Sequence, residues 1–325
     1  MPGKSSTATR RGPGALGAAL VLMLAIFAAR AWPAASEKIV MTPDELDRFD
    51  NAKHSLRLSN GVTLAYLDLG AREGRPLVLV HGYTDSARDW APIEPLLVDK
   101  FRLIIVDLRG HGASSKPDCC YTRFDFADDI KLLLDALHVE TADIAGHSLG
   151  SVVAQTFAEL WPTAARRLVL ISSTGTSFGD ISPSTGSSGP SLPGWLADLE
   201  RLHDPIHANS KFMEDWWHVS MSVNPEFFWR KQRRDAAAIP ARVWRAIADQ
   251  SLVGVDLQWM LPRIKARTLL IWGGQDVLAS SPGRDALRRG IPHAEVRTFD
   301  SLGHDLFWED PATVSAVITD FLVKP

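Results

Sequence analysis

"DIAGHSLGSVVAQ", residues 143–155, decides how this chain folds, because it places a serine and two glycines where an apolar run meets a helical pattern. A strand that passed smoothly into a helix would not need a glycine on both sides of a serine. Gly146-x-Ser148-x-Gly150 is typical of a sharp turn whose central residue is strained and whose neighbours must lack bulk. The turn exposes the Ser148 hydroxyl, and the helix that begins at Leu149 directs its first N–H groups toward it. We therefore interpret Ser148 as a candidate nucleophile, with a purely structural turn as the alternative.

Short apolar runs on both sides of this turn predict a sheet that is covered on both faces, as parallel sheets are. The runs are 77–80, 103–107, 142–146, 167–173 and 268–272. Between them lie amphipathic stretches such as 124–138, and 61–70 predicts an edge strand. The alternation of buried strands with helices implies right-handed crossovers. We therefore expect a doubly wound α/β fold whose functional loops follow the carboxyl ends of the strands.

The alternation of strands and helices stops between residues 177 and 262. This stretch opens with a segment rich in Ser, Gly and Pro and continues with aromatic helical patterns. It holds six of the 11 tryptophans, namely Trp195, Trp216, Trp217, Trp229, Trp244 and Trp259. We expect one core domain, formed by 56–176 and 263–325, with a helical lid inserted at 177–262.

A serine nucleophile needs a histidine base that a carboxylate orients, and both must come from other loops at the strand ends. Asp276 follows the apolar run in "LLIWGGQD", and His304 follows the last predicted strand in "VRTFDSLGHDLFWEDP". The order Ser148, Asp276, His304 is the one expected when the nucleophile lies on a strand–turn–helix. We expect His147 to point away from the Ser148 hydroxyl, and Asp180 is a weaker candidate for the acid.

Acyl transfer also needs N–H donors for the negative charge that develops on the substrate oxygen. The segment "LVLVHGYTDSARDW" places His81 and Gly82 at the end of a strand. The backbone N–H of Tyr83 and that of Leu149, which follows the nucleophile, are the expected pair of donors. A simple strand-to-helix turn without an anion site is the alternative for this segment.

The aromatic residues of the predicted lid favour a bulky or apolar substrate, because ligand pockets are mostly apolar with few polar anchors. The candidate pocket residues are His81, Gly82, Trp216, Trp217, Phe227 and Trp229. The lid aromatics fit the lid's own core equally well, and the sequence leaves this alternative open.

Five motifs follow one another in the match that spans residues 61–323: "HGYTDSARDW", "DLRGHGASSKP", "GHSLGS", "LLIWGGQD" and "GHDLFWEDP". With them the chain resembles the α/β-hydrolase fold superfamily, particularly its branch of lidded esterases, lactonases and epoxide-hydrolase-like proteins. The resemblance implies an eight-stranded, mostly parallel sheet, a catalytic triad of Ser148, Asp276 and His304, and no cofactor. Ser151 departs from the pattern, since many relatives have a glycine there, and we expect only a small effect on helix packing.

These observations predict a serine hydrolase that cleaves carboxylic esters of a small-molecule substrate through an acyl-enzyme. Lactone hydrolysis, including that of large-ring lactones, would use the same chemistry. A cofactor-free haloperoxidase, a C–C hydrolase and a non-catalytic ligand receptor are further alternatives. The net charge of −3 gives no basic face, so we expect no nucleic-acid partner. No His/Cys/Asp/Glu spacing predicts a metal site, and the oligomeric state is not readable from the sequence.

The N-terminus has the pattern of an export signal. Basic residues precede an apolar run at 15–29, which is shorter than the roughly 20 residues that a spanning helix needs. We expect residues 1–31 to be cleaved near Ala31, which would leave a periplasmic or secreted protein without a stable membrane span. An uncleaved N-terminal membrane anchor is the alternative. Cys119 and Cys120, the only cysteines, are expected to be reduced surface thiols.

Overall fold

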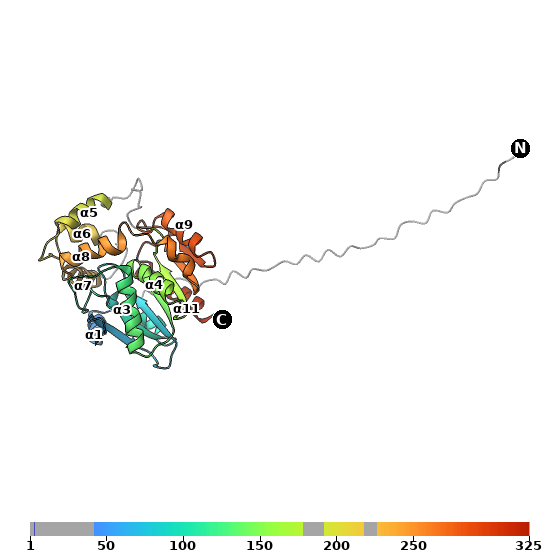
Figure 1. The fold of residues 1–325 in the computed structure, drawn as a ribbon, viewed down its shortest axis with the longest axis horizontal. Helices are drawn as coiled ribbons and strands as arrows, with labels where there is room; N and C mark the ends of the chain where they lie inside the picture. Colours follow the sequence, from blue (N-terminus) through green and yellow to red (C-terminus); the bar gives the residue numbers. More distant parts are fainter. Residues whose placement is uncertain (1–2, 4–41, 178–191, 218–225, 325) are drawn as a thin grey trace. The chain divides into compact units, whose positions relative to one another are not determined.

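The computed structural model describes residues 42–177, 192–217 and 226–324, together with Gly3 (Figure 1). The chain divides into two units, Met1–Ser36 and Glu37–Pro325, and every helix and strand described below lies in the second unit. The predicted export signal at 1–31 therefore lies outside the described residues, apart from Gly3. Among the described helices, none is both long enough and apolar enough to cross a membrane.

An eight-stranded, mostly parallel sheet forms the centre of the second unit and confirms the predicted fold class. The strand order is β1-β2-β4-β3-β5-β6-β7-β8, and β2 is the strand that runs antiparallel to both of its neighbours. The strands are β1 (His54–Arg57), β2 (Thr63–Leu69), β3 (Pro76–Val80), β4 (Arg102–Val106), β5 (Ala142–His147), β6 (Ala165–Ile171), β7 (Arg267–Gly273) and β8 (Glu295–Phe299).

Burial of the central strands explains why the sequence marks them so clearly. Every residue of β4 and β5 is buried, as expected for strands that helices cover on both faces. The sequence did not predict β1, because three of its four residues are exposed and no apolar run marks them. The expectation of an edge strand at 61–70 is therefore wrong, since β2 lies there between β1 and β4 and β1 is the edge strand.

Helices flank the sheet, and α3 packs on α4 while α11 packs on α2. A capping box at Thr122 and Asp125 starts α3, with the Thr122 side chain accepting the Asp125 N–H. The helices of the core are α1 (Pro43–Asn51), the 3₁₀ helix η1 (Ala87–Trp90), α2 (Glu94–Leu97), α3 (Arg123–Ala136), α4 (Leu149–Leu160), α9 (Ser281–Gly290), α10 (Leu306–Glu309) and α11 (Pro311–Val323).

Between β6 and β7 the chain leaves the sheet and forms helices, of which α5 to α8 lie together in Figure 1. They are α5 (Leu192–Arg201), α6 (Lys211–Trp217), α7 (Glu226–Ala237), α8 (Ala241–Ile247), the π-helical turn η4 (Ala248–Leu252) and the 3₁₀ helix η5 (Gln258–Arg263). We keep the name lid for residues 177–262. Asp180, the weaker candidate for the acid, lies outside the described residues.

Candidate active site

A tight turn joins β5 to α4, and Ser148 is the single residue between them. Its backbone has φ 51° and ψ −119°, a conformation that residues with a side chain rarely adopt. A Cβ on Gly146 would overlap the carbonyl of Gly150, and a Cβ on Gly150 would overlap the carbonyl of Val80. The two glycines are therefore needed for close backbone contact, and the turn has the strained geometry that the sequence predicted.

Hydrogen bonds fix the backbone of this turn. The Ser148 N–H donates to the Ile171 carbonyl at 3.0 Å, at the end of the neighbouring strand β6. The Ser151 hydroxyl donates to the Ser148 carbonyl at 2.6 Å and lies 2.6 Å from the Ser173 hydroxyl. Ser151 thus does more than occupy a small space in the helix, because it anchors the carbonyl of the strained residue.

Asp276 and His304, which are 28 residues apart in the chain, meet at the carboxyl ends of β7 and β8. Asp276 Oδ1 lies 2.9 Å from His304 Nδ1 and also accepts the N–H groups of Leu278 and Ala279 at 2.9 and 3.2 Å. These contacts hold the carboxylate in one orientation toward the imidazole, as expected for a carboxylate that orients a base.

Burial and charge act in opposite directions on this pair. Burial alone would lower the pKa of His304, but the adjacent Asp276 carboxylate outweighs it and raises the pKa to about 9. Burial would raise the pKa of Asp276, but the imidazole and the two N–H groups bring it below its ordinary value. Asp276 is therefore an ionised partner that stabilises the protonated imidazole.

Two side chains hold the backbone of His304 beside the turn. The His304 carbonyl accepts the Ser172 hydroxyl at 2.6 Å and faces His147 Nε2 at 3.1 Å. The rings of His147 and His304 lie with their centroids 4.9 Å apart. Within the described residues, the Ser148 hydroxyl has no hydrogen-bond partner, so no Ser148–His304 hydrogen bond is formed here. Such bonds often tighten only when substrate binds.

The loop after β3, residues 81–86, lies against the turn. We call it the oxyanion loop after the role that the sequence predicts for Tyr83. A Cβ on Gly82 would lie 3.4 Å from the Ser148 Cβ, so Gly82 directly faces the candidate nucleophile. Among the described residues, the N–H groups of Tyr83 and Leu149 have no hydrogen-bond acceptor. The role of these two N–H groups as oxyanion donors stays a prediction.

His81 is the first residue of the oxyanion loop, and its side chain contacts backbone on both sides of the ring. Its ring is fully buried, with Nε2 accepting the Leu108 N–H at 3.0 Å and Nδ1 lying 2.7 Å from the Gly82 carbonyl. Both ring nitrogens thus contact backbone, and the expectation that His81 lines a substrate pocket stays a prediction.

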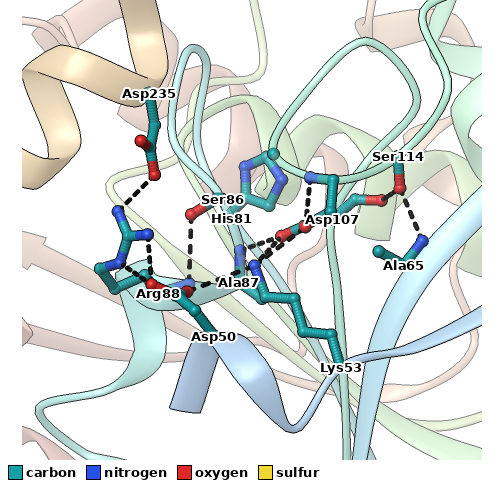
Figure 2. A network of polar contacts seen from close by, with 12 residues as sticks. Asp50, Lys53, Ala65, His81, Ser86, Ala87, Arg88, Asp107, Ser114 and Asp235 are labelled. Carbon is teal, nitrogen blue, oxygen red and sulfur yellow. Dashed lines mark hydrogen bonds and ion pairs between the residues drawn. The ribbon is translucent and has the colours of Figure 1, made fainter. Parts of the chain in front are cut away.

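A buried ion pair anchors the helix η1 that follows the oxyanion loop (Figure 2). Lys53 Nζ lies 2.9 Å from Asp107 Oδ2, and Asp107 Oδ1 accepts the Ala87 N–H at 2.7 Å. Asp107 Oδ2 also accepts the Ala113 N–H at 2.8 Å. Burial opposes ionisation of Asp107, but Lys53 and these N–H groups outweigh it and lower the pKa of the carboxyl. One carboxylate thus ties η1 to the loop after β4.

Of the four lid aromatics that the sequence suggested for the pocket, two are described. Trp216 packs against Tyr83 and against two further lid tryptophans, and Trp217 is buried. The side chains of Phe227 and Trp229 lie outside the described residues, although their backbones belong to α7.

A buried group of two carboxylates and one imidazole lies beside the turn, and the sequence does not predict it. Ligand-type atoms of Asp85, Asp89 and His147 lie within 4.8 Å of one another, the one such group in the described part of the chain. Burial, followed by repulsion from Asp89 and Asp305, raises the pKa of Asp85 well above its ordinary value. His147 Nδ1 lies 3.3 Å from Asp89 Oδ2, so the imidazole is itself a partner for that carboxylate. We assign no metal to this group, and only the fold, not residue spacing, brings it together.

Comparison with known proteins agrees with this geometry. The sequence profile of the family described as the alpha/beta hydrolase fold matches residues 75–311, most of the chain. The chain belongs to this family. The matched segment of this α/β hydrolase includes the turn at Ser148, the oxyanion loop, Asp276 and His304.

The relatives and similar structures include proteins named for several different hydrolase activities. The 2-hydroxymuconate semialdehyde hydrolase of Pseudomonas sp. strain CF600 is 29% identical over 274 residues, which cover 82% of this chain and 93% of the relative. The structure of an esterase from Exiguobacterium antarcticum has a TM-score of 0.72 and 18% identity, covering 83% of this chain and 99% of its own. The structure of the enol-lactonase of Burkholderia xenovorans LB400 has a TM-score of 0.69 and 20% identity. The match covers 83% of this chain and 100% of the enol-lactonase chain. At such identities the two structures share the fold alone.

Proposed function

We propose that this α/β hydrolase is a serine hydrolase that cleaves carboxylic esters through an acyl-enzyme. The observation that carries the proposal is the buried Asp276–His304 pair, at 2.9 Å, whose imidazole lies next to the strained turn of Ser148. A serine hydroxyl is a weak nucleophile at neutral pH unless a base within reach accepts its proton.

Each residue has one task in the proposed reaction. His304 accepts the Ser148 proton as the hydroxyl attacks the ester carbonyl, and it then returns the proton to the leaving alcohol. Asp276 orients the imidazole and stabilises its protonated form. The Tyr83 and Leu149 N–H groups stabilise the developing oxyanion, a contribution of roughly 10²–10³ in rate for each donor. Water activated by His304 then releases the acyl group.

Bulky or apolar ester substrates are the proposed class. The support is the aromatic character of the lid, where Trp195, Trp216 and Trp244 surround Tyr83 at ring-centroid distances of 5.3 to 6.2 Å. Lactone hydrolysis is the second candidate, favoured by the shared fold of the enol-lactonase. The semialdehyde hydrolase relative keeps carbon–carbon bond hydrolysis among the outcomes of a substrate test.

The direct test replaces the nucleophile. Ser148→Ala is expected to abolish turnover of a p-nitrophenyl ester while the thermal midpoint stays near that of the wild type. Ser55→Ala is the matched control, because this exposed serine on β1 is remote from the turn and should keep full activity. Retained turnover in Ser148→Ala would refute the assignment.

A substrate panel separates the candidates for the reaction. Linear esters of increasing chain length, small and large lactones, and a vinylogous diketone for carbon–carbon bond hydrolysis would be compared by kcat/KM. We expect the highest values for esters with large apolar groups. Turnover of lactones alone would favour the second candidate, and turnover of the diketone alone would contradict ester hydrolysis as the main reaction.

A further inference from the structure

Successive side chains of the oxyanion loop form hydrogen bonds with the lid. The Tyr83 hydroxyl donates to the Trp244 carbonyl of α8 at 2.6 Å, so the residue that carries a proposed oxyanion donor is fastened to the lid. Trp216 of α6 donates its indole N–H to the Thr84 hydroxyl at 2.8 Å. Both bonds are buried or partly buried, where a hydrogen bond is less weakened by water.

The next residues of the loop and η1 also reach the lid, through α7. Gln232 Nε2 donates to Asp85 Oδ1 at 3.3 Å. Arg88 Nη1 lies 2.6 Å from an Asp235 carboxylate oxygen and 3.1 Å from Gln232 Oε1, and Figure 2 shows Arg88 between Asp235 and Asp50 of α1. Three lid helices thus hold one short loop.

Thr84 is the strained residue in this set. It is buried and has φ 69°, in the left-handed region that a β-branched residue rarely adopts. Such a conformation persists only where surrounding contacts impose it, and its cost is of order 1–3 kcal/mol. Within the described residues, Trp216 makes the side-chain hydrogen bond to Thr84 from the lid, and the Asp85 N–H donates to the Gly82 carbonyl at 3.4 Å across the same turn.

The Trp216 indole is itself fixed by its neighbours. It stacks on Trp195 with a centroid distance of 5.0 Å and meets the rings of Tyr83 and Trp244 edge-on at 5.3 and 5.7 Å. Rings arranged in this way allow little rotation of the indole, so its N–H has one direction. The donor is therefore oriented before any substrate binds.

We propose that Trp216 and Thr84 are positioning residues through which the lid holds the Tyr83 N–H where the oxyanion forms. The inference rests on the proposed function and deepens it, because it makes the lid part of the machinery for stabilising the transition state. Without the hydrogen bond, Thr84 relaxes toward an ordinary φ, and the adjoining Tyr83 backbone shifts. Because the oxyanion exists only in the transition state, kcat is affected more than KM.

The test compares two substitutions of Thr84 that differ in the acceptor. Thr84→Val keeps the β-branched shape and loses the hydroxyl, and it is expected to lower kcat about 10- to 100-fold with KM changed less than about 2-fold. Thr84→Ser keeps the acceptor and should stay within about 3-fold of the wild-type kcat. Trp216→Phe removes the same bond from the lid side, and combining it with Thr84→Val should cause no further loss.

Two further measurements separate positioning from loss of folding. An alkyl boronic acid forms a tetrahedral adduct with an active serine, and its Ki should rise in Thr84→Val by the same factor by which kcat/KM falls. Arg242→Gln is the matched control, because the hydrogen bonds of Arg242 join α8 to the Lys116 and Pro117 carbonyls and not to residues 81–86. Its kcat should equal that of the wild type.

The outcomes distinguish this inference from the proposed function. If the wild type is active and Thr84→Val has the kcat and boronate Ki of Thr84→Ser, the inference is wrong and the serine mechanism stands. A fall in kcat for Arg242→Gln as large as that for Thr84→Val would also overturn it. If the wild type turns over no ester and forms no boronate adduct, both proposals fall together.

Discussion

At His304, the electrostatic environment sets the conditions under which the proposed base can work. The ring is buried against an ionised Asp276, and this partner raises the pKa of His304 from 6.5 to about 9 despite burial. A base with a raised pKa is stronger once it is neutral, but a smaller fraction of it is neutral at pH 7. The rate of the enzyme should therefore depend steeply on pH.

We predict that kcat/KM for an ester rises with pH up to about 9, because His304 accepts the serine proton only when it is neutral. Asp276→Asn removes the carboxylate that raises this pKa, so the rise should move to lower pH while kcat falls about 10³- to 10⁴-fold. A pH–rate profile for both proteins measures the shift. An unchanged midpoint in Asp276→Asn would contradict the assigned pair.

The same pKa predicts how stability varies with pH. The folded-state pKa of about 9 lies above the ordinary 6.5, so the pair stabilises the folded protein fully below pH 6.5 and loses this contribution as the pH rises through 9. His304→Gln should lack this loss. Thermal midpoints of the two proteins across this range check the prediction, and parallel curves would argue against it.

At the scale of elements, the strand–turn–helix at Ser148 depends on how closely β5, α4 and β3 approach. A Cβ at Gly150 would meet the carbonyls of Val80 and His81 at the end of β3. Backbone cannot move aside as the end of a flexible side chain can. The glycine therefore sets how near the turn lies to the oxyanion loop.

Gly150→Ala is expected to destabilise the protein by at least about 3 kcal/mol or to prevent folding, because overpacking against backbone has no easy relaxation. Gly254→Ala is the matched control: its φ is +68° and no atom lies within 4 Å of the added Cβ, so only about 1 kcal/mol of backbone strain is expected. Urea unfolding of both variants measures the difference. Equal losses would show that the close approach is not decisive.

The sequence predicts an element or a site residue only where its burial or its position at a strand end produces a local sequence pattern. The central strands leave continuous apolar runs, and the candidate triad leaves three polar residues at strand ends in a characteristic order. The strand β1 leaves no run, because it is mostly exposed. The Trp216–Thr84 bond joins residues 132 positions apart, and no periodicity or spacing predicts such a contact.

At the scale of the whole second unit, buried and partly buried ion pairs join parts that the sheet alone would leave separate. Lys53, just after α1, pairs with Asp107 after β4, and Arg88 of η1 contacts both α1 and the lid helix α7. Figure 2 shows these pairs around Ser86 and Ala87, where the oxyanion loop meets η1. The ion pairs of Arg88 thus join the core to the lid beside the candidate active site.

Asp107→Asn is expected to lower the free energy of unfolding by about 3 kcal/mol, because it leaves the Lys53 ammonium buried without its main partner. Lys131→Gln removes the partly exposed pair with Asp135 and should cost less than about 1 kcal/mol. Denaturant curves for the two variants give the comparison. A loss for Asp107→Asn no larger than that for Lys131→Gln would mean that the buried pair does not hold these parts together.

The central claim is that Ser148, activated by His304 and Asp276, is the nucleophile, and covalent labelling tests it most directly. A fluorophosphonate should add once to the wild type, with the added mass on the peptide that contains Ser148. It should not add to Ser148→Ala, and it should add far more slowly to His304→Gln. An unlabelled wild type, or a label on another residue together with full ester turnover by Ser148→Ala, would contradict the claim.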